Sequence, residues 1–436
     1  MSALATYYHF KGYKVQGSDI NENYQTKKLS QLGIKIFKGH NACNIKNVDI
    51  IIYSGAISLD NEEMQYAVKN NLPLIERSKL LGIVCNDFKN TIAVAGTHGK
   101  TTTTAMVSKV LIDSYYDPTI HIGGNYSYIN GNFKLGQKDY FVTEACEYKK
   151  SFLHLNPTYS IITNVELDHT DCYKSLNDIY NAFDKFLEQT KSFCLINGDS
   201  EYNKRIKSNK IITFGKKKHN DYRMYNIQTN LNELIFDIEY KQNYVCTLKL
   251  SVNGLYNAYN ALSCFALCHQ LNISCEIIKK SLETFKNVDR RFSFICKYGN
   301  LTIYKDYAHH PTEISNLLSM VKGLNYKKTI CIFQPHTYSR TYGLFNDFLK
   351  CFNDCNYLYL LPTYPAREQE IIGGRSEDLY EKLKQNRSNV YYLNNFKDSL
   401  LVLEKFKNEN YLVLLVGAGN IEDIEKLISK NILENI

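Results

Sequence analysis

The feature that most constrains how this chain can fold is a short apolar segment that runs directly into a glycine-rich turn. The segment is Thr91-Ile92-Ala93-Val94-Ala95, the turn reads Gly96-Thr97-His98-Gly99-Lys100-Thr101-Thr102, and a helical pattern continues from Thr103 to Leu111. Strand, glycine turn and helix in this order are typical of α/β folds, in which backbone N–H groups of the turn bind phosphate oxygens at the positive end of the helix. The pattern therefore predicts a phosphate-binding loop.

The polar residues of the loop have separate expected roles. In such loops the lysine reaches the β- and γ-phosphates and the neighbouring hydroxyl binds Mg²⁺, so we expect Lys100 on the phosphates and Thr101 on the cation. Val94 stands where the common G-x-x-x-x-G-K-[ST] pattern has its first glycine, so this loop is a shortened form. The alternative is a strand-to-helix turn that contains Gly and Lys by chance. The residues expected to bind ATP are Gly96, Thr97, His98, Gly99, Lys100, Thr101 and Thr102.

The rest of the chain divides into three blocks, since 436 residues exceed one ordinary domain. The first block alternates short strands ending near Asp19 and Tyr53 with a helical stretch expected to run from Met64 to Ile75, which favours a parallel doubly wound sheet. The second contains the loop and a periodic helix over 257–269. Strands in the third lie at 301–304, 328–333 and 411–416. We expect domains at 1–89, 90–291 and 292–436.

Composition excludes several other classes of protein. The net charge of +8 is spread along the chain with only Lys216-Lys217-Lys218 as a run, so no nucleic-acid partner is expected. No apolar run approaches the roughly 20 residues of a membrane span, and Met1 to Thr6 lack the features of a secretory signal. The 13 cysteines show no C-x-x-C pair and are expected to be reduced thiols. These observations favour a cytoplasmic protein without membrane insertion.

Further motifs follow the loop in a fixed order. They are Glu144-Ala145-Cys146-Glu147, Thr163-Asn164-Val165-Glu166-Leu167-Asp168-His169, Asn257-Ala258-Tyr259-Asn260, Asp289-Arg290-Arg291-Phe292, Lys305-Asp306-Tyr307-Ala308-His309-His310-Pro311-Thr312-Glu313 and Phe333-Gln334-Pro335-His336-Thr337-Tyr338-Ser339-Arg340-Thr341. With the shortened loop, this collinear set resembles the Mur ligases, which build the peptide of bacterial cell-wall precursors. The last two stretches resemble the branch of that family that adds L-alanine.

The resemblance implies a fold and a reaction. The fold would be α/β with three domains: a Rossmann-like N-terminal domain, a central P-loop ATPase-like domain and a Rossmann-like C-terminal domain. The reaction would be ATP-dependent ligation of L-alanine to UDP-N-acetylmuramate through an acyl phosphate, giving ADP and phosphate, in peptidoglycan precursor biosynthesis. ATP and Mg²⁺ are the implied cofactors, UDP-N-acetylmuramate and L-alanine the substrates, and the enzyme would be a monomer or homodimer.

The resemblance also implies roles for individual residues. Glu144 and His169 would join Thr101 as Mg²⁺ ligands. Asn257 and Asn260 would contact ATP, Arg291 would reach its phosphates, and Asp306 would contact the nucleotide from the third domain. Tyr307, His309 and Arg340 would form the alanine site. The implied catalytic set is Lys100, Glu144, His169, Arg291 and Asp306. For the two asparagines the open alternative is helix capping, and for Arg340 it is a surface salt bridge. Arg290 is expected to be a structural partner.

The sequence departs from the family pattern mainly at its start. Met1-Ser2-Ala3-Leu4-Ala5 is similar to the helix that follows a G-x-G-G-x-G loop in the family, so that loop and the strand before it are missing from the expected UDP-sugar site. Asp19 and Ser54 are then the remaining candidates for that site. No lysine matches the carbamylated lysine of some relatives. Two other functions stay open: a sibling ligase adding a peptide or another amino acid, and a truncated nucleotide-binding protein without ligase activity.

Overall fold

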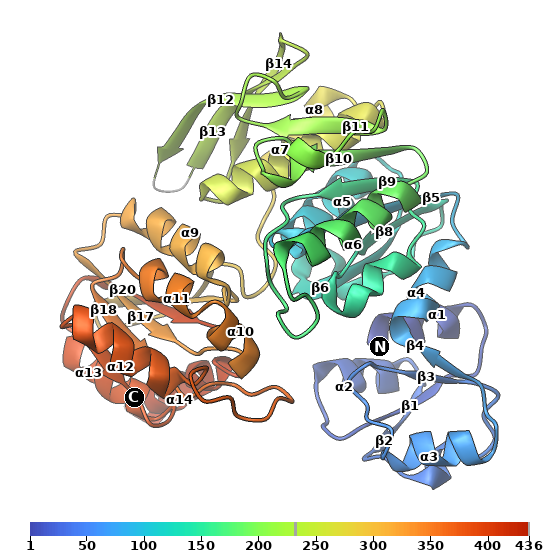
Figure 1. Ribbon diagram of the computed structural model, residues 1–436, viewed down its shortest axis with the longest axis horizontal. Helices are drawn as coiled ribbons and strands as arrows, with labels where there is room; N and C mark the ends of the chain where they lie inside the picture. Colours follow the sequence, from blue (N-terminus) through green and yellow to red (C-terminus); the bar gives the residue numbers. More distant parts are fainter. Residues whose placement is uncertain (231–232, 435–436) are drawn as a thin grey trace.

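The computed structural model describes residues 1–230 and 233–434, and Figure 1 shows the chain as three bodies that follow one another in sequence. The three-domain α/β organisation expected from the sequence is confirmed. The residues at which one domain ends and the next begins stay a prediction. Within the described part of the chain, no helix combines the length and apolar character needed to cross a membrane.

The N-terminal body contains two small parallel sheets. Strand β1 (Gln16–Asp19) pairs with β2 (Lys35–Lys38), and β3 (Ile51–Tyr53) pairs with β4 (Leu74–Glu76). The helices are α1 (Ser2–Phe10), α2 (Tyr24–Gln31), η1 (Ala42–Ile45), α3 (Glu62–Lys69) and α4 (Arg77–Cys85).

The prediction of one helix from Met64 to Ile75 is wrong for its second half, because α3 ends at Lys69 and β4 begins at Leu74. The side-chain amide of Asn70 donates to the Tyr66 carbonyl (2.8 Å), and Asn71 takes a left-handed conformation with φ 50°. Pro73 then lacks the N–H that a continuing helix would need. The turn chemistry of three residues therefore overrides the apolar pattern.

The central body is built on a ten-stranded sheet of order β14-β13-β12-β11-β10-β9-β5-β8-β6-β7. Strand β5 (Asn90–Ala95) lies between β8 (Tyr140–Glu144) and β9 (Tyr159–Ile162), parallel to both. The other strands are β6 (Thr119–Tyr126), β7 (Gly131–Lys134), β10 (Phe193–Asn197), β11 (Ile211–Gly215), β12 (Tyr222–Asn230), β13 (Glu233–Tyr240) and β14 (Asn243–Leu250). The last three form an antiparallel extension of the sheet.

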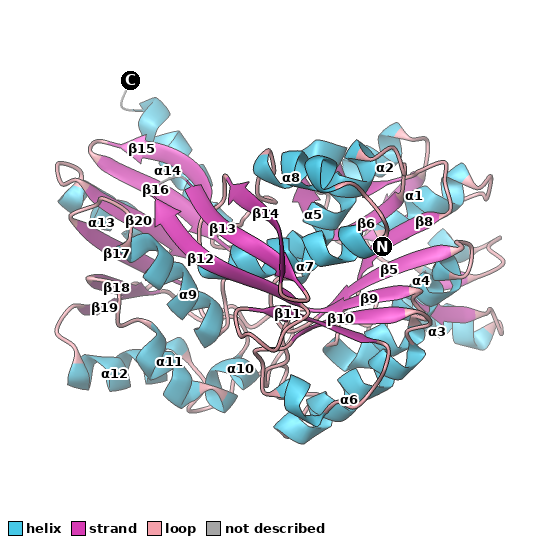
Figure 2. Ribbon diagram, turned by 90° about the horizontal axis from the view of Figure 1, so that it is seen from above, coloured by secondary structure: helices cyan, strands magenta, loops and turns pink. Residues whose placement is uncertain are grey.

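Helices cover both faces of this sheet, which explains why β5 is apolar from Ile92 to Ala95 (Figure 2). Ile92 and Val94 pack with α5 (Lys100–Asp113), α7 (Leu255–Gln270) and α8 (Cys275–Glu283). Ala93 and Ala95 face the opposite core with α6 (Leu176–Gln189). Short 3₁₀ helices are η2 (Ser127–Ile129), η3 (Tyr148–His154) and η4 (Tyr202–Arg205).

The C-terminal body has a six-stranded sheet of order β15-β16-β20-β17-β18-β19, parallel except for its first strand. The strands are β15 (Ser293–Tyr298), β16 (Leu301–Asp306), β17 (Lys328–Phe333), β18 (Tyr357–Leu360), β19 (Val390–Tyr392) and β20 (Tyr411–Val416). The helices are α9 (Pro311–Lys322), α10 (Tyr338–Gly343), α11 (Phe345–Cys351), α12 (Ser376–Asn386), α13 (Asp398–Phe406) and α14 (Glu422–Glu434). Its strand ends carry the last two sequence motifs toward the central body.

Candidate active site

The two glycines of the phosphate loop are required by its close packing. Gly96 and Gly99 have φ values of 133° and 83°, which side chains rarely adopt. A Cβ at Gly96 would lie 2.0 Å from Thr163 Oγ1, and one at Gly99 would lie 2.5 Å from Asn260 Oδ1. The loop is therefore clamped between the segment after β9 and the first turns of α7, two regions that the sequence motifs had singled out separately.

The segment after β9 holds the loop by hydrogen bonds. The Asn164 side-chain oxygen accepts from the His98 N–H (2.8 Å), and the Thr163 hydroxyl donates to the His98 carbonyl (2.6 Å). The Thr97 hydroxyl accepts from the Glu166 N–H (2.9 Å). These bonds fix the position of the loop and occupy the His98 N–H, so a phosphate would bind the backbone N–H groups that follow it.

Lys100 lies folded over the loop. Its ammonium donates to the carbonyls of Gly96 (2.5 Å) and Thr97 (3.0 Å) and pairs with Glu147, 2.9 Å from Oε2. Burial would lower the pKa of Lys100, but the Glu147 carboxylate outweighs burial and raises it. Lys100 is therefore a fixed cation beside the space where the loop would bind phosphate.

Glu147 is a site residue that the sequence reasoning did not select, although it lies inside a quoted motif. Its side chain is only 1% exposed, and its partners are Lys100 and His169, the latter with Nε2 3.6 Å from Oε1. Burial would raise the pKa of Glu147, but Lys100 and His169 together lower it. The signal that could have found it is a second acid three residues after Glu144, since a buried lysine in a phosphate loop needs a counter-charge.

Two oxygen ligands suited to Mg²⁺ lie side by side at the end of β8 and the start of α5. The Thr101 hydroxyl donates to Glu144 Oε2 (3.1 Å), and the Gly123 N–H donates to Glu144 Oε1 (2.6 Å). Burial raises the pKa of Glu144, and a bound cation would oppose that shift by favouring the charged form. Hydroxyl and carboxylate oxygens are the donors that Mg²⁺ prefers, so these residues fit it.

His169, the third expected metal ligand, has different neighbours. Its Nε2 atom lies 3.6 Å from Glu147 and 3.7 Å from Asp168, and its ring lies 4.8 Å from that of Tyr148. The described contacts thus join His169 to the Lys100–Glu147 pair, and its role as a ligand stays a prediction.

The asparagine pair on α7 lies against the loop. Both side chains are buried, Asn257 donates to the Asn253 carbonyl (2.7 Å), and the Asn260 oxygen faces Gly99. Helix α7 begins after Gly254 without a side-chain cap, so the capping alternative is wrong.

The junction between the central and C-terminal bodies carries Arg291 and Asp306. The Asp306 carboxylate accepts from the N–H groups of Phe292 (2.8 Å) and Ala308 (2.7 Å), and burial raises its pKa to about 6. The Arg291 guanidinium lies 5.2 Å from the Tyr307 ring centre. Arg290 instead donates to the Gly417 and Gly419 carbonyls, which makes it a structural partner as expected.

Arg340 is not on the surface, so the surface salt-bridge alternative is wrong. It is 5% exposed and binds Asp168 with two parallel hydrogen bonds, Nε to Oδ1 (2.8 Å) and Nη2 to Oδ2 (3.2 Å). Burial would raise the pKa of Asp168, but Arg340 holds it well below its usual range. The pair joins α10 of the C-terminal body to the segment after β9.

The other alanine-site candidates lie near Arg340. His309 Nδ1 faces the Tyr307 carbonyl (2.9 Å), and its ring centre lies 5.9 Å from that of His336, whose carbonyl accepts from Arg340 (3.1 Å). Burial lowers the pKa of His309 to about 3 and that of His336 to about 4, so both imidazoles are neutral near pH 7. The two neutral rings lie beside a guanidinium whose charge Asp168 already balances.

The UDP-sugar candidates lie at the carboxyl ends of two parallel strands. Asp19 ends β1 and accepts from the Asn21 N–H (2.9 Å), while the Ser54 hydroxyl follows β3 and accepts from the Ala56 N–H (3.2 Å). These bonds stabilise turns. Lys149 donates to the Gly55 carbonyl (3.4 Å), which links the end of β3 to the segment carrying Glu147.

Comparison with known proteins gives consistent results over the whole chain. Residues 1–89 match the description "Mur ligase family, catalytic domain", residues 94–268 match "Mur ligase middle domain", and residues 290–419 match "Mur ligase, glutamate ligase domain". The UDP-N-acetylmuramate–L-alanine ligase of Clostridium tetani is 42% identical over 427 residues, covering 97% of this chain and 93% of the relative. The enzyme of the same name from Caldicellulosiruptor bescii is 36% identical over 436 residues, covering 99% of this chain and 96% of the relative.

Solved structures agree. The crystal structure of UDP-N-acetylmuramate–alanine ligase from Thermotoga maritima matches with a TM-score of 0.86 and 30% identity, covering 100% of this chain and 97% of that one. A murein peptide ligase from Psychrobacter arcticus matches with a TM-score of 0.72 at 20% identity, a level that reflects the shared fold alone.

Proposed function

The chain belongs to the Mur ligase family, and we propose that it joins L-alanine to the lactoyl carboxylate of UDP-N-acetylmuramate with hydrolysis of ATP to ADP and phosphate. The observation that carries the choice of substrates is the 42% identity over 97% of the chain to a ligase of that name. The arrangement of Lys100, Thr101 and Glu144 around the loop supports the use of ATP.

The reaction needs two steps, because a carboxylate is a poor electrophile. First, a carboxylate oxygen of the sugar attacks the γ-phosphorus of ATP, the bond to the β-phosphate oxygen breaks, and an acyl phosphate and ADP form. Second, the L-alanine amine, as the free base, attacks the acyl carbon, and the tetrahedral intermediate expels phosphate to leave the amide. Both steps bring anions together, so fixed cations carry most of the catalysis.

The residues of this chain divide that work. Lys100 would hold the β- and γ-phosphates, while Asn257 and Asn260 would bind the nucleotide from α7. Thr101, Glu144 and His169 would hold Mg²⁺, which would supply positive charge against the phosphates. Arg291 would reach the same phosphates across the domain junction, with Asp306 fixing the backbone beside it.

The amino acid would bind in the C-terminal domain. The carboxylate of L-alanine would accept from the Nη2 hydrogen of Arg340 that the bonds to Asp168 and His336 leave unused, with Tyr307 and His309 lining the pocket. Asp19 and Ser54 would contact the UDP-sugar from the N-terminal domain. We further propose a cytoplasmic location, where both ATP and the nucleotide sugar are available.

Phosphate release from ATP and Mg²⁺ tests the proposal, with UDP-N-acetylmuramate and a panel of single amino acids plus a murein tripeptide. Release that needs both the sugar and L-alanine supports it, and a preference for the tripeptide would favour the peptide-adding sibling instead. Lys100→Met should lower turnover about 10²- to 10³-fold, the typical effect of removing one fixed donor from a transition state. Near-normal turnover in that variant would contradict the assignment of this loop as the phosphate-binding loop.

A further inference from the structure

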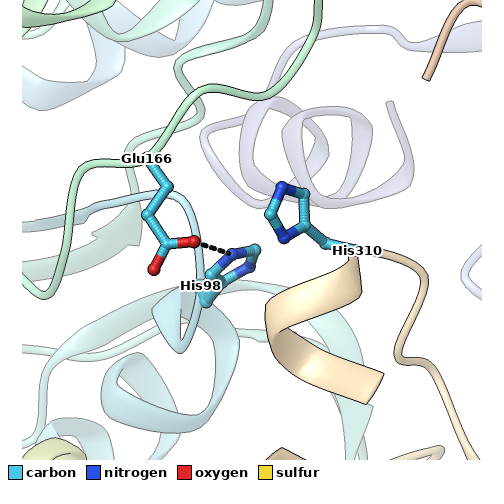
Figure 3. Close-up of side chains that lie close together, drawn as sticks. All are labelled: His98, Glu166 and His310. Carbon is cyan, nitrogen blue, oxygen red and sulfur yellow. Dashed lines mark ion pairs between the residues drawn. The ribbon is translucent and has the colours of Figure 1, made fainter. Parts of the chain in front are cut away.

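A second group of potential metal ligands lies apart from Thr101 and Glu144, where the phosphate loop meets the C-terminal domain. It consists of His98 from the loop, Glu166 from the segment after β9 and His310 from the start of α9 (Figure 3). One ligand atom from each of the three residues lies within 4.8 Å of the other two. The described contacts of these side chains are with one another and with the domain interface, and the proposed ligase reaction gives Glu166 and His310 no task.

The side chains beside His98 favour a positive charge on its ring. Its Nδ1 atom lies 3.1 Å from Glu313 Oε1, and its Nε2 atom lies 3.5 Å from Glu166 Oε2. Burial would lower the pKa of His98, but the two carboxylates outweigh burial and raise it to about 10. The Nε2 atom is nevertheless buried, and its proton makes no hydrogen bond to a described residue. A divalent cation at that position would replace the proton, and its second positive charge would balance the second of the two carboxylates around His98.

The second nitrogen of His98 has the partner that metal-bound histidines usually have. A ligating imidazole commonly donates its other N–H to a carboxylate, which fixes the tautomer and the ring orientation. Glu313 occupies that position at 3.1 Å. Glu166 is oriented in the same way, since its Oε2 atom accepts from the Thr312 hydroxyl at 2.7 Å.

His310 can turn toward the same point at small cost. Its ring centre lies 4.6 Å from that of His98, and Figure 3 shows a ring nitrogen facing His98. Its two present hydrogen bonds are long, 3.3 Å from the Thr312 N–H and 3.4 Å to the Leu167 carbonyl. Zinc bonds of about 2.0–2.2 Å would need the three ligand atoms to approach one another by roughly 1 Å, which side-chain rotation provides.

We propose that His98, Glu166 and His310 form a binding site for a divalent transition-metal cation, Zn²⁺ or a cation of similar ligand preference, between the central and C-terminal domains. Two imidazoles and one carboxylate suit such cations better than Mg²⁺, which prefers oxygen donors. The bound cation ties the phosphate loop to α9. It therefore holds the two domains together and slows the opening that product release requires.

The test is titration of the whole chain with Zn²⁺ alone, followed by calorimetry. His310→Ser removes one ligand while keeping a residue that caps a helix N-terminus well, and Glu166→Gln removes the carboxylate charge without changing its shape. Both should weaken binding of one equivalent of Zn²⁺ at least about 10-fold, whereas His9→Ser, which removes an imidazole from α1, should bind like the parent. All four proteins contain the same 13 cysteines, so thiol binding cancels in the comparison.

Two outcomes would overturn the site: no Zn²⁺ binding by the parent chain, or equal binding by the parent and both variants. Thermal melting checks that each variant is folded, and if His310→Ser is not, Glu166→Gln decides alone. The absorption spectrum of bound Co²⁺ gives an independent readout, because thiolate ligands add a charge-transfer band that nitrogen and oxygen ligands lack. Substrates are absent from these measurements, so failure of the site leaves the proposed ligase function untouched.

Discussion

The central domain meets its two neighbours through interfaces of opposite chemistry. Toward the N-terminal domain the buried part of the contact is apolar, with exposed polar bonds from Lys28 and Lys149. Leu4 and Tyr7 of α1 are buried in one core with Phe141 and Phe152 of the central domain. Helix α4 approaches η3 so closely that a Cβ at Gly82 would lie 2.2 Å from the His154 carbonyl oxygen.

Toward the C-terminal domain the contact consists of charges and polar groups. The Asp168–Arg340 pair, the His98–Glu313 pair and the Thr312–Glu166 hydrogen bond all cross it. Water can solvate charges when an interface opens, whereas exposed apolar surface has no such compensation. We therefore expect the N-terminal and central domains to stay together and the C-terminal domain to open and close around the reaction.

The largest expected effect is on the apolar side. Tyr7→Ala should lower the free energy of unfolding by about 3–5 kcal/mol, because it empties a fully buried aromatic position. Chemical denaturation measures this, with the exposed Tyr13→Ala of the same segment as the control. If Tyr7→Ala were no more harmful than the control, the N-terminal interface would not be the fixed one.

On the charged side the effect should fall on activity rather than stability. Arg340→Gln leaves Asp168 unpaired in the closed form, which costs about 3 kcal/mol and corresponds to roughly 10²-fold lower kcat/KM. The melting temperature should change little, since opening lets water reach Asp168. Small-angle scattering with and without ATP should show closure in the parent and less of it in the variant. A large loss of stability with normal closure would contradict the comparison.

The charged interface should also respond to pH on both sides of neutrality. The pKa of His309, lowered to about 3 by burial, lies below its unfolded value, so its contribution is present above about pH 6.5 and is lost as pH falls toward 3. The pKa of His98, raised to about 10, acts in the opposite sense: its contribution is complete below about pH 6.5 and is lost as pH rises through 10.

Closure should therefore be most stable near pH 6.5, where both contributions are complete. The apolar interface should not weaken between pH 8 and 10, because burial lowers the pKa values of its Met1 ammonium and of the nearby His121 to about 6 and about 3. Hydrogen exchange at the segment after β9 and at α1, followed across this pH range, separates the two interfaces. If exchange at both places responded equally to pH, the conclusion that charged groups dominate only the interface with the C-terminal domain would be wrong.

The smallest expected effect is a single hydrogen bond on the apolar side. Tyr7→Phe removes the bond from its hydroxyl to Asp87 (2.6 Å) and keeps the ring, so the loss should be about 1 kcal/mol. Measured beside Tyr7→Ala, it separates the polar from the apolar contribution to this interface. A loss as large as that of Tyr7→Ala would mean that the hydroxyl, not the ring, holds α1 in place.

Local pattern predicted some parts of this fold closely. The helix expected over 257–269 is α7 (Leu255–Gln270), and the strand expected over 91–95 is β5 (Asn90–Ala95). The segment 72–75 was misassigned, because its apolar residues suit a helix or a strand equally well and the turn at Asn70 and Asn71 decides between them. Local pattern was insufficient for the site as well: it predicted Lys100 as a site residue but did not predict its partner Glu147.

The sequence by itself determined the phosphate loop, the order along the chain of the strands and helices around it and the family. The loop and each motif consist of residues close together in the chain, and the family follows from the order of those motifs. Only the tertiary structure decided which charges meet: Arg340 with Asp168, His98 with Glu313, and Lys100 with Glu147. These partners lie far apart in the chain and carry no local signal. Parallel strands bring them together, since each strand ends at the same edge of its sheet and the edges of two sheets face one another across the domain junction.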